Sequence, residues 1–146
     1  VNVVAKMKEV NAVIGGEGNG GIIVPDFHYG RDALIGIGLF LTHLAKSGKT
    51  MQELRNSYPS YFISKNKIEL TPQIDVDGVL NKIASIYDSE SVNRIDGVKI
   101  DFEHGWVHLR KSNTEPIIRI YAEHATEIEA NKLANQVITD IRLAIS

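Results

Sequence analysis

The sequence predicts an α+β protein whose C-terminal half is an antiparallel sheet with helices on one face. Two observations lead to this prediction. After residue 60, apolar and polar residues alternate in several segments, which is typical of half-buried strands. The segments 75–87 and 126–145 instead carry apolar residues at helical spacing. Before residue 58, short apolar runs flank a glycine-rich loop and are followed by a helical pattern, so this part of the chain is organised differently from the C-terminal half.

Five elements are expected in the first 57 residues: a helix over 3–10, short strands over 12–14 and 22–24, and helices over 32–45 and 50–56. The strand over 12–14 is expected to be buried, because all three of its residues are apolar. Asp32 is the expected N-cap of the long helix. Thr50 and Glu53 have the spacing of a capping box at the start of the short helix.

Residues 58–74 are interpreted as a linker and the first strand, and residues 75–146 as the C-terminal domain. The elements expected here are strands over 61–70, 98–102, 106–110 and 117–124, and helices over 75–87 and 126–145. In the first of these helices the residues expected to point inward are Val76, Val79, Leu80, Ile83 and Ile86. His104 and Gly105 are expected to form a tight turn, with glycine supplying the unusual φ.

The composition is that of a globular protein, with 43% hydrophobic and 23% charged residues among 146. The net charge of −2 argues against nucleic-acid binding, which usually requires a basic excess. The longest apolar run, residues 33–41, is too short to span a bilayer. The absence of cysteine excludes disulfides and thiolate chemistry. We therefore expect a cytoplasmic protein without nucleic-acid or membrane partners.

The first loop with a chemical signature is the glycine-rich segment 15–21, in which five of seven residues are glycine. Its spacing matches neither a dinucleotide-binding fingerprint nor a P-loop. Glu17 can accept hydrogen bonds and Asn19 can both donate and accept, so the pair suits the neutral hydroxyls of a sugar. A plain glycine-rich turn between two strands explains the same residues about equally well.

The second loop, residues 110–116, concentrates hydrogen-bond donors between two strands. Its candidate phosphate ligands are Arg110, Ser112, Asn113 and Thr114, together with Arg119 just beyond the loop. A guanidinium presents a planar fork that matches phosphate oxygens, and hydroxyls and backbone amides add further donors. Strand alternation places both arginines off the core face, so they can converge. We therefore favour an anion site over a bare polar turn.

Metal ligands are not expected in this chain. Its five histidines lack the spacing of a metal motif. Asp75 and Asp77 are better explained as residues at a helix N-terminus, where carboxylates complement the dipole. Because Val1 already stands within a helical pattern, we expect the chain to be a fragment of a longer polypeptide.

The two loops together resemble the alpha-D-phosphohexomutase family. The segment 16–21, Gly-Glu-Gly-Asn-Gly-Gly, is similar to the sugar-binding loop of the family's third domain. The segment 110–116, Arg-Lys-Ser-Asn-Thr-Glu-Pro, is similar to the phosphate-binding loop of its fourth domain. The resemblance covers nearly the whole chain and implies that residues 1–57 end an α/β domain 3. It also implies that residues 75–146 form domain 4, which is TATA-binding-protein-like.

The resemblance assigns roles to particular residues. Glu17 and Asn19, with Gly20 beside them, would contact the hexose hydroxyls, and Arg110, Ser112, Asn113, Thr114 and Arg119 would grip the phosphate that does not react. Many bacterial members carry serine at the position of Asn19 and histidine at that of Gly21. The version in this chain is more similar to the archaeal-type phosphoglucosamine mutase and phosphomannomutase branch. If the family histidine assists proton transfer, His28 is a candidate replacement.

The family interconverts hexose 6-phosphate and hexose 1-phosphate through a hexose 1,6-bisphosphate intermediate. The resemblance thus implies an isomerase-type intramolecular phosphotransferase that uses a phosphoserine and a Mg²⁺ ion held by a D-x-D-x-D-R motif. This chain contains no such motif. Phosphoserine and Mg²⁺ ligands are therefore expected in upstream domains of the same polypeptide, and the fragment alone is expected to be inactive. The expected substrate is a hexose phosphate, with phosphoglucosamine or phosphomannose favoured. The alternative is a stand-alone sugar-phosphate-binding module without catalysis.

Overall fold

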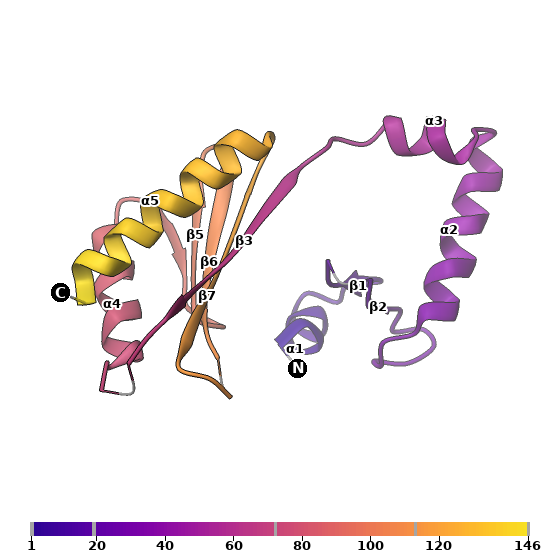
Figure 1. Ribbon diagram of the computed structural model, residues 1–146. Helices are drawn as coiled ribbons and strands as arrows, with labels where there is room; N and C mark the ends of the chain where they lie inside the picture. The colour runs from indigo at the N-terminus through magenta and orange to yellow at the C-terminus, as the bar shows by residue number, and fades with distance from the viewer. Residues whose placement is uncertain (1, 19, 72, 113, 146) are drawn as a thin grey trace. The chain divides into compact units, whose positions relative to one another are not determined.

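The protein is represented by a computed structural model that describes residues 2–18, 20–71, 73–112 and 114–145 (Figure 1). Two compact units make up the chain, Val1–Pro59 and Ser60–Ser146. Each unit has its own secondary structure.

The first unit is built mainly of helices. Its elements are α1 (Asn2–Glu9), β1 (Gly15–Gly16), β2 (Ile22–Ile23), α2 (Ala33–Ser47) and α3 (Met51–Asn56). Strands β1 and β2 pair antiparallel around the glycine-rich loop. The Asp32 carboxylate accepts hydrogen bonds from the first N–H groups of α2, and Thr50 and Glu53 form a reciprocal capping box at α3. Both caps predicted from the sequence are confirmed.

The prediction of a buried strand over 12–14 is wrong. The strand lies at Gly15–Gly16 instead, and the side chains of Val13 and Ile14 are 81% and 52% exposed. In the described part of this unit, β1 and β2 contribute only two residues each to the sheet. So small a hairpin cannot cover the apolar residues that precede it.

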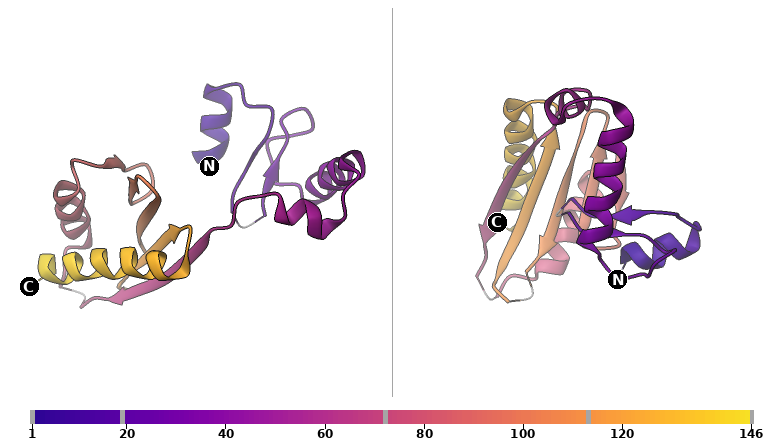
Figure 2. Two further views of the ribbon diagram at one scale, coloured as in Figure 1. Left: turned by 90° about the horizontal axis from the view of Figure 1, so that it is seen from above. Right: turned by 90° about the vertical axis from the view of Figure 1, so that its right-hand side faces the viewer.

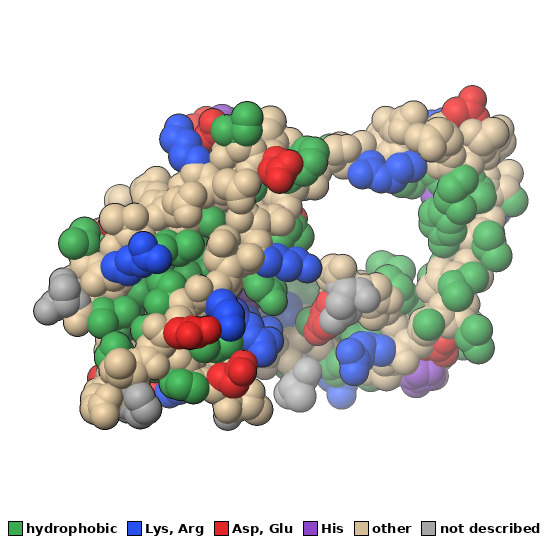
Figure 3. All heavy atoms as spheres, in the orientation of Figure 1, with side chains coloured by type: hydrophobic (Ala, Val, Ile, Leu, Met, Phe, Trp, Pro, Cys, Tyr) green, Lys and Arg blue, Asp and Glu red, His purple; other side chains and the backbone are tan. Residues whose placement is uncertain are grey.

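Helix α2 is apolar but uncovered. None of its residues is buried, and Leu34, Ile37 and Leu41 are each more than half exposed. Phe40, on another side of the helix, is 38% exposed. Figure 3 shows hydrophobic side chains along the visible side of this helix. A helix that is hydrophobic on all sides normally lies inside a protein, whereas the described part of the first unit leaves much of the apolar surface of α2 uncovered.

The second unit is an antiparallel sheet covered by two helices. Its elements are β3 (Phe62–Glu69), α4 (Val76–Ile86), β4 (Ser91–Asn93), β5 (Val98–Phe102), β6 (Gly105–Lys111), β7 (Ile117–His124) and α5 (Glu127–Ile145). The strands are ordered β3-β7-β6-β5-β4, and every pair is antiparallel. Helices α4 and α5 lie on the same face of the sheet (Figures 1 and 2). The predicted fold class is confirmed.

The core of the second unit lies between the sheet and these two helices. The largest side chains in it that are fully buried are Ile83, Ile100, Val107, Leu109, Ile118, Ile120, Val137 and Ile141. At the edge of the core, the Tyr87 hydroxyl donates a hydrogen bond to the Asp140 carboxylate and so links the end of α4 to α5. Burial is the main cause that raises the pKa of Tyr87. Within the described part of the second unit, no helix packs on the other face of the sheet, which carries Arg110 and Arg119.

Three details of the second unit differ from the sequence prediction. Strand β4 was not predicted, because Val92 is its single apolar residue. Ile86, predicted to point inward, is 51% exposed, whereas Tyr87 is buried in its place. The tight turn consists of Glu103 and His104, since Gly105 already pairs with Phe102. Gly105 fills a narrow position in β6, where a Cβ atom would lie 2.4 Å from the Glu123 carbonyl oxygen.

Candidate functional site

The second polar loop joins β6 to β7 and is flanked by two arginines. Arg110 and Arg119 are directly opposite each other in the β6–β7 ladder. Residues paired in this way have Cβ atoms about 4.5–5.5 Å apart on one face of the sheet. Their neighbours Leu109 and Ile120 are fully buried, so the arginines project from the open face, and both are exposed. The sheet therefore places Arg110 and Arg119 next to each other on one face, off the core, as strand alternation predicted.

Inside the loop, two hydroxyl groups lie side by side. Ser112 Oγ and Thr114 Oγ1 are 3.3 Å apart, and the Thr114 N–H donates to Ser112 Oγ over 3.4 Å. The Ser112 N–H donates to the Ile117 carbonyl and closes the base of the loop. Asn113, the third predicted ligand here, lies outside the described residues. A set of hydroxyl donors next to two guanidiniums is chemically suited to a phosphate.

Two of the positively charged side chains at this loop, Arg110 and Lys111, form ion pairs with carboxylates. Arg110 Nη2 lies 3.0 Å from Asp96 Oδ2, and Lys111 Nζ lies 2.7 Å from Asp77 Oδ2. Arg119 forms no ion pair with any carboxylate in the part of the chain that the structure describes. One guanidinium is thus oriented by a counter-ion and the other is available to an incoming anion.

Asp96 was not singled out from the sequence, yet the fold places it at the site. Its main-chain oxygen lies 2.6 Å from Nε2 of His108, and because a carbonyl only accepts, this ring nitrogen carries a proton. The contact fixes the backbone next to the Asp96–Arg110 ion pair. No local signal could have revealed it, because Asp96 and Arg110 are brought together by strand pairing alone.

The glycine-rich loop forms a tight hairpin between β1 and β2. The Glu17 N–H donates to the Gly21 carbonyl and the Gly20 N–H donates to the Glu17 carbonyl, each over 3.0 Å. Gly20 has φ +89°, a conformation that L side chains rarely adopt. Glu17 is exposed, and Asn19 lies outside the described residues. The geometry is that of a turn that presents a carboxylate, which suits a sugar hydroxyl.

His28 is held in place just before α2. Its Nδ1 accepts a hydrogen bond from the Gly30 N–H over 2.9 Å. The neutral ring therefore carries its proton on Nε2, which lies 3.2 Å from Asp32 Oδ2. The Ile35 N–H, followed by His28, lowers the pKa of Asp32. Both ring nitrogens already have partners, so His28 would have to leave Asp32 before it could exchange protons with a substrate.

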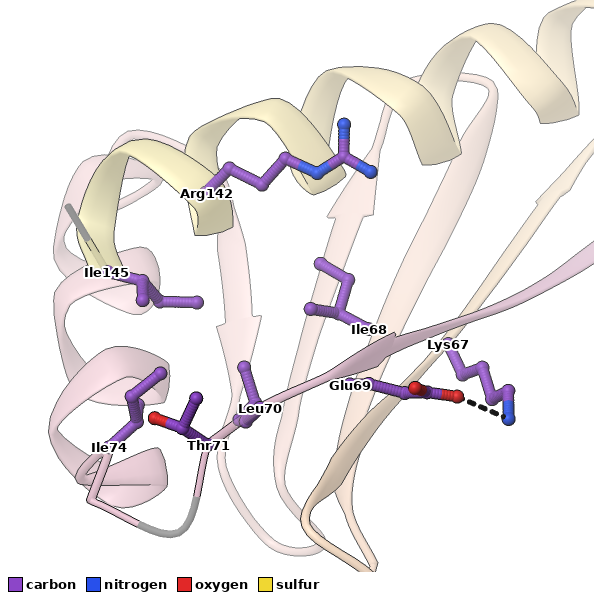
Figure 4. A pocket seen from close by; sticks show the side chains of 8 residues that line it. All are labelled: Lys67, Ile68, Glu69, Leu70, Thr71, Ile74, Arg142 and Ile145. Atoms are coloured by element: carbon purple, nitrogen blue, oxygen red, sulfur yellow. Dashed lines mark ion pairs between the residues drawn. The ribbon is translucent and has the colours of Figure 1, made fainter.

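Besides these loops, the possible metal ligands and a hollow beside β3 also bear on what the molecule could bind. No three His, Asp or Glu side chains gather closely enough for a metal ion among the residues that the structure describes, so these residues do not fit the Mg²⁺ ion that the family resemblance implies. A hollow of about 470 Å³ is lined by eight residues of β3, the segment that follows it, and α5: Lys67, Ile68, Glu69, Leu70, Thr71, Ile74, Arg142 and Ile145 (Figure 4). It contains none of the site residues predicted from the sequence, so we assign no substrate to it.

None of the described helices is long and apolar enough to cross a membrane.

Two family models match the chain. Residues 1–61 match the phosphoglucomutase/phosphomannomutase alpha/beta/alpha domain III, and residues 66–139 match the C-terminal domain of the same proteins. These matches agree with an α/β part that carries a glycine-rich loop, followed by an antiparallel-sheet domain that carries an arginine-flanked loop. The two models describe two domains of the same family of proteins. The chain belongs to the alpha-D-phosphohexomutase family.

Similar proteins include two archaeal relatives. The chain is 40% identical to a phosphoglucosamine/phosphogalactosamine mutase of Sulfurisphaera tokodaii, over 94% of this chain and 30% of that protein. It is 39% identical to a phosphoglucomutase/phosphomannomutase of Thermococcus kodakarensis, over 89% and 28%. A phosphoglucomutase/phosphomannomutase family protein of Burkholderia thailandensis shares the fold, with a TM-score of 0.73 and 23% identity over 97% of this chain and 30% of that one. The chain thus spans about a third of the length of the proteins it matches.

Proposed function

We propose that this chain is the substrate-holding C-terminal part of a phosphohexomutase. The complete enzyme would interconvert hexose 6-phosphate and hexose 1-phosphate through a hexose 1,6-bisphosphate. The observation that carries the proposal is the pairing of Arg110 with Arg119 beside the hydroxyls of Ser112 and Thr114. The names of the relatives refer to mutases of glucosamine, galactosamine, glucose and mannose phosphates, and among these we favour glucosamine or mannose phosphates as substrates.

The two loops divide the work of holding the substrate. The phosphate that does not react would bind the loop 110–116 and Arg119, with Asn113 as a further donor. The sugar hydroxyls would bind Glu17 and Asn19, with Gly20 allowing a close approach of the backbone. An enzyme that must accept its sugar in two orientations benefits from gripping ring and phosphate separately. In this proposal, the phosphoserine and the Mg²⁺ ion belong to preceding domains. The Mg²⁺ ion would neutralise charge on the phosphoryl group that is transferred.

The apolar surface of α2 supports an enzyme part rather than a stand-alone module. A module that works by itself would expose this helix, with Leu34 81% in contact with solvent. Large uncovered apolar surfaces usually mark an interface. We propose that upstream segments of the same polypeptide cover α2 and complete the α/β domain. The division into residues 1–57, 58–74 and 75–146 and a cytoplasmic location are part of the same proposal.

The test of this function is an assay of the complete polypeptide that contains this chain. It should convert glucosamine 6-phosphate, mannose 6-phosphate or glucose 6-phosphate into the corresponding 1-phosphate, and the three rates would rank the substrates. A complete polypeptide that turns over none of them while binding phosphate at residues 110–116 would support the stand-alone binding module instead.

The isolated 146-residue chain is expected to show no mutase activity at any Mg²⁺ concentration. It supplies groups that position a substrate, whereas phosphoryl transfer also needs a donor and charge neutralisation. The measurement is turnover of a hexose 1-phosphate, with the complete polypeptide as a positive control. Turnover by the purified chain would contradict the assignment of the phosphoryl donor to upstream domains.

Replacing Glu17 with alanine in the complete enzyme is expected to raise KM for the hexose phosphate by about tenfold or more, because charge-assisted hydrogen bonds to hydroxyls are lost. Glu103→Ala is the matched control, since Glu103 is an exposed turn residue outside the proposed site. If Glu17→Ala has the kinetics of the Glu103→Ala variant on every substrate, the glycine-rich loop is only a turn.

A further inference from the structure

A third cation stands in line with the two arginines of the phosphate loop. In the β3–β7 ladder, Lys67 lies directly opposite Arg119, which in turn lies opposite Arg110 on β6. Three positive side chains therefore occupy one level of three neighbouring strands, on the same face of the sheet. Like charges at directly opposite positions repel each other and destabilise a sheet. An anion bound over this row would remove the repulsion.

The side chain of Lys67 lies on the face that carries the arginines. Figure 4 shows Ile68 and Leu70 pointing towards α5, while the charged ends of Lys67 and Glu69 point to the other side of the strand. Lys67 Nζ lies 3.0 Å from Glu69 Oε1, and the two side chains are 60% and 76% exposed. Such an exposed ion pair contributes little stability and exchanges partners readily.

The ammonium of Lys67 also interacts electrostatically with a residue of the phosphate loop. The hydrogen bond to Glu69 is the largest cause that raises the pKa of Lys67, and the charge of Glu115 raises it further. Glu115 belongs to the loop 110–116, so Lys67 lies within electrostatic reach of that loop. The strand register and this electrostatic interaction both connect β3 to the phosphate loop.

We propose that Lys67 is a third cation of the phosphate site and that Glu69 is its counter-ion when no ligand is bound. This inference rests on the proposed function and adds a strand that the loop motif does not contain. The ligand class is a phosphate dianion, whether inorganic phosphate or the phosphate group of a sugar. Arg110 and Arg119 offer planar forks, and the ammonium of Lys67 turns from Glu69 to an oxygen that the forks leave open.

Lys65 provides a matched control on the same strand and face. It lies opposite Tyr121 rather than Arg119, with its ammonium 5.8 Å from the centre of the Tyr121 ring. Two residues along a strand correspond to about 6.6 Å, so Lys65 is one step further from the arginines. Lys65→Met and Lys67→Met remove the same charge from the same strand, and only the second removes the proposed ligand contact.

The experiment is a titration of the 146-residue chain, followed by NMR of the backbone amides, with inorganic phosphate in one arm and glucose 6-phosphate in the other. For both ligands Lys67→Met should weaken binding about threefold to tenfold, whereas Lys65→Met should change it less than about twofold. Glu69→Gln should tighten binding about twofold to fivefold, because it releases Lys67 from its counter-ion. Unchanged amide shifts far from the site would show that each variant is folded.

The outcomes separate this inference from the function on which it rests. If the amides of residues 110–116 fail to shift in the unaltered chain, the phosphate loop itself is misassigned. If they shift but Lys67→Met binds as the unaltered chain does, or no more weakly than Lys65→Met, the role of Lys67 is overturned while the loop stands. Binding of inorganic phosphate alone, without glucose 6-phosphate, would also overturn Lys67 as a substrate ligand.

Discussion

Arg110→Lys should lower kcat/KM of the complete enzyme by about 10- to 100-fold, with a higher KM and a slower turnover together. A guanidinium binds two phosphate oxygens through a planar fork, and an ammonium can occupy only one point of that contact. Lysine also cannot keep both the Asp96 carboxylate and the phosphate in the same geometry, because its charge is not spread over a plane. Orientation of the substrate suffers along with affinity.

The fold should survive this substitution. The Arg110 side chain is 53% exposed and projects from the open face of the sheet, away from the buried Leu109. Arg94→Lys is the matched control, since Arg94 is exposed and hydrogen-bonds Asn81 outside the proposed site. Steady-state kinetics of both variants would decide the matter. Equal kcat/KM values for Arg110→Lys and Arg94→Lys would mean that Arg110 does not grip the phosphate.

Much of the second unit was predictable because its determinants are local. Alternation of Val107 and Leu109 with polar neighbours defines which face of β6 is buried, and Val98 and Ile100 do the same for β5. In the first unit, the starts of α2 and α3 were predictable for the same reason, because the side chains of Asp32 and Thr50 act within a single turn. The pairing of Arg110 with Arg119 could be anticipated as well, because one short loop connects their strands.

Other parts of the site depend on strand register, which single residues do not reveal. Lys67 reaches the arginines through the β3–β7 ladder, a pairing between segments far apart in the sequence. Asp96 reaches Arg110 through a turn after β4, a strand whose sequence, Ser-Val-Asn, contains a single apolar residue. In the sequence, nothing distinguishes Lys67 and Asp96 from other charged residues, because only the strand pairing of the sheet brings them to the arginines.

The apolar residues of the first unit show a different limit. Val13 and Ile14 have the sequence of a buried strand, and α2 that of a buried helix, yet all are largely exposed. A hydrophobic residue favours burial, but its hydrophobicity does not show which segment of the protein packs against it. In our proposal the rest of the α/β domain packs against these residues. The apolar sequence pattern therefore predicts burial in the complete protein better than it predicts burial in this chain.

The turn between β4 and β5 depends on a glycine that has two constraints. Gly97 has φ +78°, and a Cβ atom at this position would lie 2.2 Å from the carbonyl oxygen of Leu109. The first constraint is conformational, and asparagine tolerates such φ values better than most residues do. The second is steric and involves rigid backbone, so any side chain violates it. The preceding residue, Asp96, is the one that holds Arg110.

Gly97→Ala should therefore lower the free energy of unfolding of the second unit by about 2–4 kcal/mol, the sum of left-handed strain and a backbone collision. Urea unfolding followed by the fluorescence of Trp106 reports on this unit alone, because Trp106 is the chain's single tryptophan and lies in β6. Gly97→Asn separates the two causes. If the collision with Leu109 dominates, asparagine should destabilise about as much as alanine; recovery to near the stability of the unaltered chain would show that φ alone matters. Whichever variant keeps its fold should also bind phosphate more weakly, because a displaced turn moves Asp96 away from the guanidinium that it orients.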